Sequence, residues 1–226
     1  MMQAPKPQTC PLCHGGTPSL FAEVRGSPYY QCNTCHLIFL DPQLRPDPDA
    51  EKAHYDTHDN DPADPGYRNF LWRLAEPLLA KLEPGAEGLD YGAGPGPTLS
   101  IMLEERGFPM TIHDPFYDHN PAALERRYDF ITCTETAEHF FNPGEEFQRL
   151  DRLLKPNGWL GLMTLRRDPD KDFASWHYLR DPTHVCFYDD ETLEWIADHF
   201  GWQLEIISNS VALFHRRPGI RAVSNS

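Results

Sequence analysis

The sequence predicts an α/β fold in which a doubly wound, mainly parallel sheet ends in an antiparallel hairpin and follows a small zinc-ribbon-like module. Three observations support this prediction: strand-like and helix-like segments alternate from residue 66 onward, glycines alternate directly after the first of these strands, and two Cys-x-x-Cys pairs precede them. Strands that alternate with helices are typical of a parallel sheet with helices on both faces. The 226 residues suffice for one such domain with a small appendage.

The N-terminal module, residues 1–41, is defined by two cysteine pairs, Cys10 with Cys13 and Cys32 with Cys35. Two such pairs can supply four thiolates to a tetrahedral Zn²⁺. A segment this short buries too little core to fold alone, so bound metal would supply much of its folding free energy. A redox dithiol or a set of disulfides is the alternative. Because disulfides are rare in cytosolic proteins, we expect structural zinc.

Residues 42–65 are rich in proline and aspartate, as in Asp47-Pro48 and Asp64-Pro65. Prolines disfavour regular helix, and repeated Asp-Pro steps favour turns or extended chain. We therefore expect a connector without helix, in which Tyr55 could fold over a nearby ligand.

The main domain, residues 66–217, opens with apolar residues at helical spacing from Tyr67, and Pro77 is expected to kink or divide that helix. The following segments are expected in the order strand 87–91, helix 97–106, strand 110–114, helical piece 122–126, strand 130–135, helix 145–154, strand 159–165, helix 189–199, and strands 202–208 and 211–215. The last two strands lie too close together for a crossover helix, so they should form a hairpin. The tail, residues 218–226, is expected to be disordered.

The first strand runs into Asp90-Tyr91-Gly92-Ala93-Gly94-Pro95-Gly96. Glycines let the backbone turn sharply and let a ligand approach the amides at the start of the next helix. The spacing Gly-x-Gly-x-Gly departs from the Gly-x-Gly-x-x-Gly of dinucleotide sites, which argues against nicotinamide or flavin. We expect another nucleotide-like ligand here.

Asp114 ends the second strand, where open α/β sheets place ligand contacts. Its carboxylate could accept hydrogen bonds from both ribose hydroxyls, or it could only form a turn before Pro115. Phe116 is placed to flank a base.

This loop resembles motif I of the class I S-adenosylmethionine-dependent methyltransferases. The resemblance covers about residues 66–215 and includes Glu138-His139, Asn142-Pro143 and the run from Leu154 to Trp159. It implies a Rossmann-like, seven-stranded-type sheet, although the third strand is hard to see between Tyr117 and Tyr128. It also implies S-adenosylmethionine as cofactor, with a weaker role near adenine for Asp118. The cofactor-binding residues are then expected to be Asp90, Tyr91, Gly92, Gly94, Gly96, Asp114, Phe116 and Thr134.

The fourth strand ends in Glu135-Thr136-Ala137-Glu138-His139. If the chain is helical there, Glu135, Glu138 and His139 share one face. The pattern is similar to the Glu-x-x-Glu-His element of ubiquinone-pathway O-methyltransferases and of small-RNA 3′-terminal 2′-O-methyltransferases, where it binds a divalent metal. The resemblance to the RNA enzymes implies His184 as a fourth ligand. Carboxylates with imidazoles suit Mn²⁺, Fe²⁺, Co²⁺ or Zn²⁺ better than Mg²⁺.

The alternative is a metal-free pocket. There His139, beside Glu138, would be the general base, because an imidazole titrates near neutral pH. The aromatic segment 172–180 could form a lid over a planar acceptor, or it could bury itself under the domain.

Composition favours some classes of partner and function over others. The formal net charge of -14 gives no general attraction to phosphate backbones, so nucleic acid is disfavoured as a partner. Without an apolar leader or a run of about 18 apolar residues, we expect a soluble cytoplasmic protein that does not contact membranes. The leading hypothesis is methyl transfer to a small-molecule acceptor, at oxygen. The alternatives are an RNA methyltransferase that binds through the zinc module, and a non-catalytic interaction protein.

Overall fold

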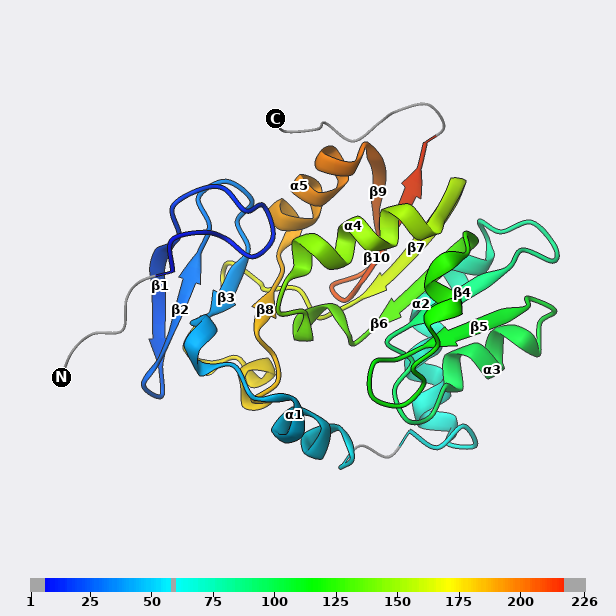
Figure 1. Ribbon diagram of the computed structural model, residues 1–226, viewed down its shortest axis with the longest axis horizontal. Helices are drawn as coiled ribbons and strands as arrows, with labels where there is room; N and C mark the ends of the chain where they lie inside the picture. Colours follow the sequence, from blue (N-terminus) through cyan, green and yellow to red (C-terminus); the bar gives the residue numbers. More distant parts are fainter. Residues whose placement is uncertain (1–6, 58–59, 218–226) are drawn as a thin grey trace.

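A computed structural model describes residues 7–57 and 60–217 of the protein (Figure 1). The expected disordered tail, residues 218–226, lies outside these described residues. The described chain forms a small four-stranded sheet and a larger six-stranded sheet, with helices packed around the larger one.

The small sheet is antiparallel and has the strand order β1-β2-β3-β8. Its strands are β1 (Ser19–Val24), β2 (Ser27–Gln31), β3 (Ile38–Leu40) and β8 (Cys186–Phe187). Only the first three strands come from the N-terminal segment. The edge strand β8 comes from the late part of the chain and pairs Phe39 with Cys186. The four-cysteine segment is therefore joined to the main domain by a strand ladder.

The segment after β3 contains helices, so the expectation of a connector without helix is wrong. The short 3-10 helix η1 (Pro42–Leu44) is followed by α1 (Pro48–Tyr55). The side chain of Asp47 caps α1 by accepting a hydrogen bond from the Ala50 amide, and Pro48 occupies the first turn. Proline is tolerated at that position because its missing N–H has no partner within the helix.

The large sheet has the order β5-β4-β6-β7-β10-β9. Strands β4 to β7 pair in parallel, whereas β10 is antiparallel to both β7 and β9. The bounds are β4 (Gly88–Tyr91), β5 (Met110–His113), β6 (Tyr128–Thr134), β7 (Leu154–Met163), β9 (Trp202–Ile206) and β10 (Val211–Arg216). The predicted mainly parallel sheet with a C-terminal hairpin is confirmed.

Helices cover both faces of this sheet. The helix bounds are α2 (Pro65–Leu79), α3 (Thr98–Glu104), α4 (Pro143–Leu153) and α5 (Asp190–Phe200). Successive strand residues point to opposite faces, so Phe130 packs in the core with α2 and α3, while Ile131 packs in the core with α4 and α5. Pro77 does not divide α2, because it lies in the last turn of the helix.

Two details differ from the expected pattern. Where the resemblance implies a third strand, the described chain forms the 3-10 helix η2 (Pro121–Glu125), and the sheet has six strands. In addition, α4 runs directly into β7. Leu154 pairs with Tyr128 and Trp159 with Phe130, so residues 155–158 bulge out of the ladder, with Asn157 in the left-handed region at φ 66°.

Within residues 7–57 and 60–217, none of the helices has both the length and the apolar character that a membrane span requires.

Candidate functional site

A cavity of about 610 Å³ lies at the carboxyl ends of β4, β5 and β6. This is the edge at which parallel sheets bind ligands. The cavity is lined by all eight residues expected to contact a cofactor: Asp90, Tyr91, Gly92, Gly94, Gly96, Asp114, Phe116 and Thr134. Asp118 is not among the lining residues, because it folds back to pair with Asp114 in a small turn.

Asp90 is the buried carboxylate at the end of β4. It is 4% exposed and accepts hydrogen bonds from Ser100 Oγ at 3.0 Å and from Thr132 Oγ1 at 2.7 Å. Burial raises its pKa to about 6, and the two hydroxyl donors partly oppose that increase. The carboxylate therefore lies on the cavity wall with its negative charge poorly solvated, so a cation in the cavity would be attracted to it.

The glycine loop has little room for side chains. Gly92 has φ +79°, and a Cβ there would lie 2.3 Å from Thr136 Cγ2. A Cβ on Gly96 would lie 2.4 Å from the Asn60 carbonyl oxygen. Both positions therefore require glycine, and the loop forms a close-fitting cradle at the start of α3.

Asp114 ties this loop to the end of β5. Its Oδ2 accepts from the Gly94 amide at 2.9 Å, and its Oδ1 accepts from the amides of Phe116 and Tyr117 at 2.8 and 3.0 Å. A carboxylate has about four acceptor positions, so one remains for a ligand hydroxyl. The aspartate thus shapes the turn and also lines the cavity.

The other end of the cavity holds a group of potential metal ligands. Glu138, His139 and His184 each offer a ligand atom, and these atoms all lie within 4.8 Å of one another. Glu138 and His139 belong to the 3-10 helix η3 (Ala137–His139), and His184 comes just before β8.

Glu135 is not part of this group. The helical turn begins only at Ala137, and Glu135 precedes it with φ 48°. The rule that residues i, i+3 and i+4 share a helix face therefore does not apply to it. Glu135 lines the cavity instead, and its pKa is raised to about 9 by burial and by the nearby charge of Glu138.

Hydrogen bonds orient the three grouped side chains. His139 Nδ1 lies 3.0 Å from the Thr183 carbonyl oxygen, and His184 Nδ1 lies 2.8 Å from the Tyr178 carbonyl oxygen. Since a carbonyl can only accept, both imidazoles donate from Nδ1 and carry the lone pair on Nε2 when neutral. Metal-binding histidines are commonly oriented in this way.

Glu138 completes the arrangement. It is fully buried, and its Oε1 accepts a hydrogen bond from the Tyr178 hydroxyl. Its Oε2 is buried without a hydrogen-bond partner among the described residues. Burial raises the pKa of this carboxyl, while nearby His184 opposes the shift. An unsatisfied buried carboxylate oxygen is costly, so this oxygen is suited to a cation.

Of the aromatic segment 172–180, the side chains of Phe173 and Tyr178 are buried in the core, whereas His177 and Arg180 are exposed. Tyr178 is 7% exposed, and the ring of Trp176 is 5.1 Å from it. The structure instead places α1 against the cavity, where Glu51 and Tyr55 line it and share a 2.7 Å hydrogen bond. Tyr55 thus lies beside the cavity, in line with the expectation that it could fold over a ligand, whereas Glu51 was not expected there. Their i, i+4 spacing places both on one face of a helix, but this segment was expected to be extended.

Further contacts fix α1 in this place. His54 Nε2 lies 3.0 Å from Asp181 Oδ2, and the Tyr117 hydroxyl donates to Asp56 at 2.6 Å. Asp181 itself lines the cavity. Asp181 carries no local sequence signal for this role, because its contact with α1 joins segments far apart in the chain.

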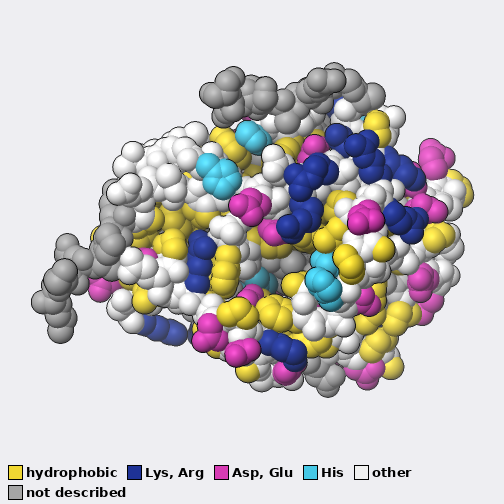
Figure 2. Space-filling view, in the orientation of Figure 1, with side chains coloured by type: hydrophobic (Ala, Val, Ile, Leu, Met, Phe, Trp, Pro, Cys, Tyr) yellow, Lys and Arg dark blue, Asp and Glu magenta, His cyan; other side chains and the backbone are white. Residues whose placement is uncertain are grey.

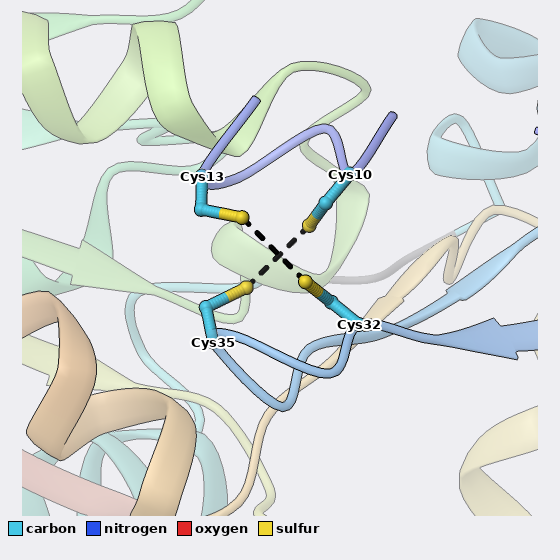
Figure 3. Close-up of side chains that lie close together, drawn as sticks. All are labelled: Cys10, Cys13, Cys32 and Cys35. Atoms are coloured by element: carbon cyan, nitrogen blue, oxygen red, sulfur yellow. Dashed lines mark hydrogen bonds between the residues drawn. The ribbon is translucent and has the colours of Figure 1, made fainter. Parts of the chain in front are cut away.

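The four cysteines of the N-terminal module also converge, and Figure 3 shows their sulfurs pointing toward one another. The Sγ atoms of Cys10 and Cys35 lie 3.4 Å apart, and those of Cys13 and Cys32 lie 3.5 Å apart. Sulfurs bound to one zinc at ~2.3 Å would be about 3.8 Å apart. The cluster would therefore accommodate Zn²⁺ after a small expansion, as expected of a zinc-binding module.

A mainly parallel sheet with helices on both faces, a cavity at its carboxyl edge and a C-terminal antiparallel part defines the class of doubly wound α/β domains. Within that class, a family described as a methyltransferase domain matches residues 36–206. Because this match covers most of the chain, the chain belongs to that family, and its main domain is a class I S-adenosylmethionine-dependent methyltransferase domain.

Curated relatives match shorter segments. The ubiquinone biosynthesis O-methyltransferase of Proteus mirabilis is 29% identical over 90 residues, which are 40% of this chain and 37% of that protein. The protein with the same name from Sodalis glossinidius is 33% identical over 96 residues, which are 42% and 38% of the two chains. The matches thus span less than two fifths of these relatives.

Solved structures agree on the fold. The structure of Burkholderia thailandensis 1,6-didemethyltoxoflavin-N1-methyltransferase, solved with 1,6-didemethyltoxoflavin and S-adenosylhomocysteine, has a TM-score of 0.53 and 17% identity. The match covers 88% of this chain and 99% of that one. At this identity the likeness shows the shared fold alone.

The raised pKa of Asp90 predicts a pH-dependent loss of stability. Its folded-state pKa of about 6 exceeds the ordinary value of 3.8, so folded protein binds this proton more tightly than unfolded chain. Protonation of Asp90 therefore stabilises the folded state fully below pH 3.8, and this stabilisation is lost as the pH rises through about 6. We expect Asp90→Asn to raise the free energy of unfolding by on the order of 2 kcal/mol more at pH 8 than at pH 4.5.

Urea unfolding at the two pH values measures this difference. Asp198 is exposed, so Asp198→Asn is the matched control, and its free energy of unfolding should change with pH as that of the wild type does. If the free energies of unfolding of Asp90→Asn and wild type differ by the same amount at both pH values, the pKa of Asp90 is not raised.

Proposed function

We propose that the protein transfers a methyl group from S-adenosylmethionine to a hydroxyl of a small-molecule acceptor, with assistance from a divalent cation held by Glu138, His139 and His184. The observation that carries this proposal is the orientation of these side chains. Two imidazoles donate from Nδ1 to backbone carbonyls, and one buried carboxylate oxygen, Glu138 Oε2, lacks a partner among the described residues.

The cofactor end of the cavity supports the first half of the proposal. The glycine cradle excludes side chains, Asp114 retains an acceptor position, and the Thr134 hydroxyl is buried without a hydrogen-bond partner in the described chain. S-adenosylmethionine, when bound, supplies an electrophilic sulfonium methyl group. Asp90 and Asp114 would hold the amino-acid and ribose ends, while Phe116 would flank the adenine.

The ligand group supports the second half. Two imidazoles and one carboxylate leave coordination positions open for an acceptor, as catalytic sites require. A bound divalent cation supplies Lewis acidity that lowers the pKa of an acceptor hydroxyl. Glu138 and the two histidines would fix the position of that hydroxyl, and the cavity walls would restrict its orientation. Glu135 lies nearby as a further carboxylate but is not assigned as a ligand.

The cavity and the relatives favour a small acceptor that is methylated at oxygen. A volume of about 610 Å³ lies in the range of small-molecule sites. Helix α1 contributes Glu51 and Tyr55 to the lining, which limits the open side. The curated relatives are named as O-methyltransferases, which is the support for oxygen as the methylated atom.

Methylation of RNA through the four-cysteine module is less well supported. Between residues 7 and 41, Arg25 is the only lysine or arginine. On the face shown in Figure 2, the basic side chains gather over α4 rather than over this module. Since phosphate contacts supply most of the sequence-independent affinity for nucleic acids, the module offers little for RNA binding. A structural Zn²⁺ held by the four thiolates is the role we propose for it.

Binding of S-adenosylhomocysteine tests the cofactor assignment. Gly94 lines the cavity at φ +65°, so Gly94→Asp would place a carboxylate beside Asp114 in the cradle. We expect calorimetric titration to show at least ~100-fold weaker binding, equivalent to about 2.7 kcal/mol.

Gly107→Asp is the matched control, because Gly107 also has positive φ but has open space around it. It should bind S-adenosylhomocysteine as the wild type does. Unchanged binding by Gly94→Asp would remove the glycine loop from the cofactor site.

Titration with Mn²⁺ tests the ligand assignment. Glu138→Gln keeps the size of the side chain but removes its charge, and His184→Ala removes a whole ligand. We expect each change to weaken Mn²⁺ binding by ~100-fold or more, since even residues that only support a ligand contribute 10- to 100-fold, roughly. Electron paramagnetic resonance of free Mn²⁺ gives the affinity.

His177→Ala changes an exposed histidine close to His184 in the chain and serves as the control. If Glu138→Gln and His184→Ala both retain wild-type affinity for Mn²⁺, the three-residue site is wrong, and His139 as a metal-free general base becomes the better hypothesis.

A further inference from the structure

We propose that the four-cysteine module is a positioning element for the Glu138–His139–His184 site, and that metal bound by its thiolates holds that site in the geometry described above. The proposal rests on the proposed function only in naming the chemistry of the positioned site. The proposed transfer reaction involves no residue of the four-cysteine module. The module also has few basic side chains with which to bind a nucleic acid.

The first connection runs through β3 and β8. The Leu40 amide of β3 donates to the Val185 carbonyl at 2.9 Å, and the Val185 amide donates to the Glu138 carbonyl at 2.8 Å. Val185 is fully buried and directly follows His184 in the chain. One peptide segment therefore bonds to the module on one side and to the backbone of a proposed ligand on the other.

The second connection runs through the N-terminal end of α4. The Gly144 amide donates to the Pro11 carbonyl at 3.1 Å, inside the first Cys-x-x-Cys turn. A Cβ on Gly144 would lie 2.3 Å from the Leu12 carbonyl oxygen, so turn and helix are in direct contact. Just before α4, the Phe140 carbonyl accepts a hydrogen bond from Cys186 Sγ at 3.1 Å.

The module depends on its thiolates for this geometry. Cys32, Cys35 and Leu37 are fully buried, and the Cys32 amide donates to the Leu37 carbonyl at 3.0 Å. The second cysteine pair thus leads straight into β3. A segment this small folds stably only with a metal or a partner surface. Loss of the metal should therefore release β3 first, and with it the Leu40–Val185 bond that supports the ligand segment.

Hydrogen exchange on the full chain tests the proposal. The comparison is between wild-type protein loaded with one Zn²⁺ and Cys13→Ser, which removes one thiolate. We expect the Val185 amide to exchange at least ~10-fold faster in Cys13→Ser. The exchange rates of amides in the β4–β5 ladder should change less than about twofold, because a local opening at the module does not require unfolding of the whole protein. Asn33→Ala, an exposed change in the second Cys-x-x-Cys turn, is the control and should match the wild type.

A second variant separates the connection from the metal. Leu40→Pro deletes the donor to Val185 but leaves all four thiolates. We expect it to retain Zn²⁺ and yet to lower the affinity for added Mn²⁺ by about 10-fold, the loss typical of a residue that supports a ligand.

Two results would overturn the proposal: unchanged exchange at Val185 in Cys13→Ser, or accelerated exchange across the whole large sheet, which would make the module a general folding requirement instead. Failure of the proposed function is recognised separately, because it would appear as absent Mn²⁺ or S-adenosylhomocysteine binding in zinc-loaded wild type. The exchange at Val185 needs neither ligand.

Discussion

The structure of the site depends on residues 178–185, whose backbone carbonyls and Tyr178 hydroxyl form hydrogen bonds with the proposed ligands. The carbonyls of Tyr178 and Thr183 accept from the two imidazoles, and the Tyr178 hydroxyl donates to Glu138. This segment has little regular structure of its own beyond one turn of 3-10 helix, and it leads directly into β8, which pairs with β3. The geometry of the cavity is therefore set by contacts between distant parts of the chain.

A second constraint is the concentration of carboxylates in a poorly solvated cavity. Burial raises the pKa of Asp90 to about 6 and that of Glu135 to about 9, and it also raises the pKa of Glu138. Such groups destabilise the folded chain when they are charged and unpaired. Both of the proposed ligands, a sulfonium compound and a divalent cation, would bring positive charge to these groups. The electrostatic cost in the free protein is thus consistent with a site built for cations.

The sequence was sufficient where local patterns decide the structure. Hydrophobic period predicted the helices, the short gap between residues 208 and 211 predicted the hairpin, and the glycines predicted the cradle at Asp90. It was insufficient where capping or distant contacts decide. Asp47 and Pro48 start a helix in a segment that was expected to be extended. Glu135 has a left-handed backbone and lies outside the group of Glu138, His139 and His184. The contacts of Tyr178 and Val185 with Glu138 join segments far apart in the chain.

In the proposed cation site, backbone carbonyls fix which ring nitrogen of His139 and of His184 carries the proton. Nitrogen-15 NMR of protein labelled at histidine, recorded above the pKa of the imidazoles, measures this directly. We expect His139 and His184 both to be protonated at Nδ1, the less common form of neutral imidazole, with Nε2 unprotonated. Signals that place the proton of either ring on Nε2 would contradict the proposed cation site, because that nitrogen could then not bind a cation.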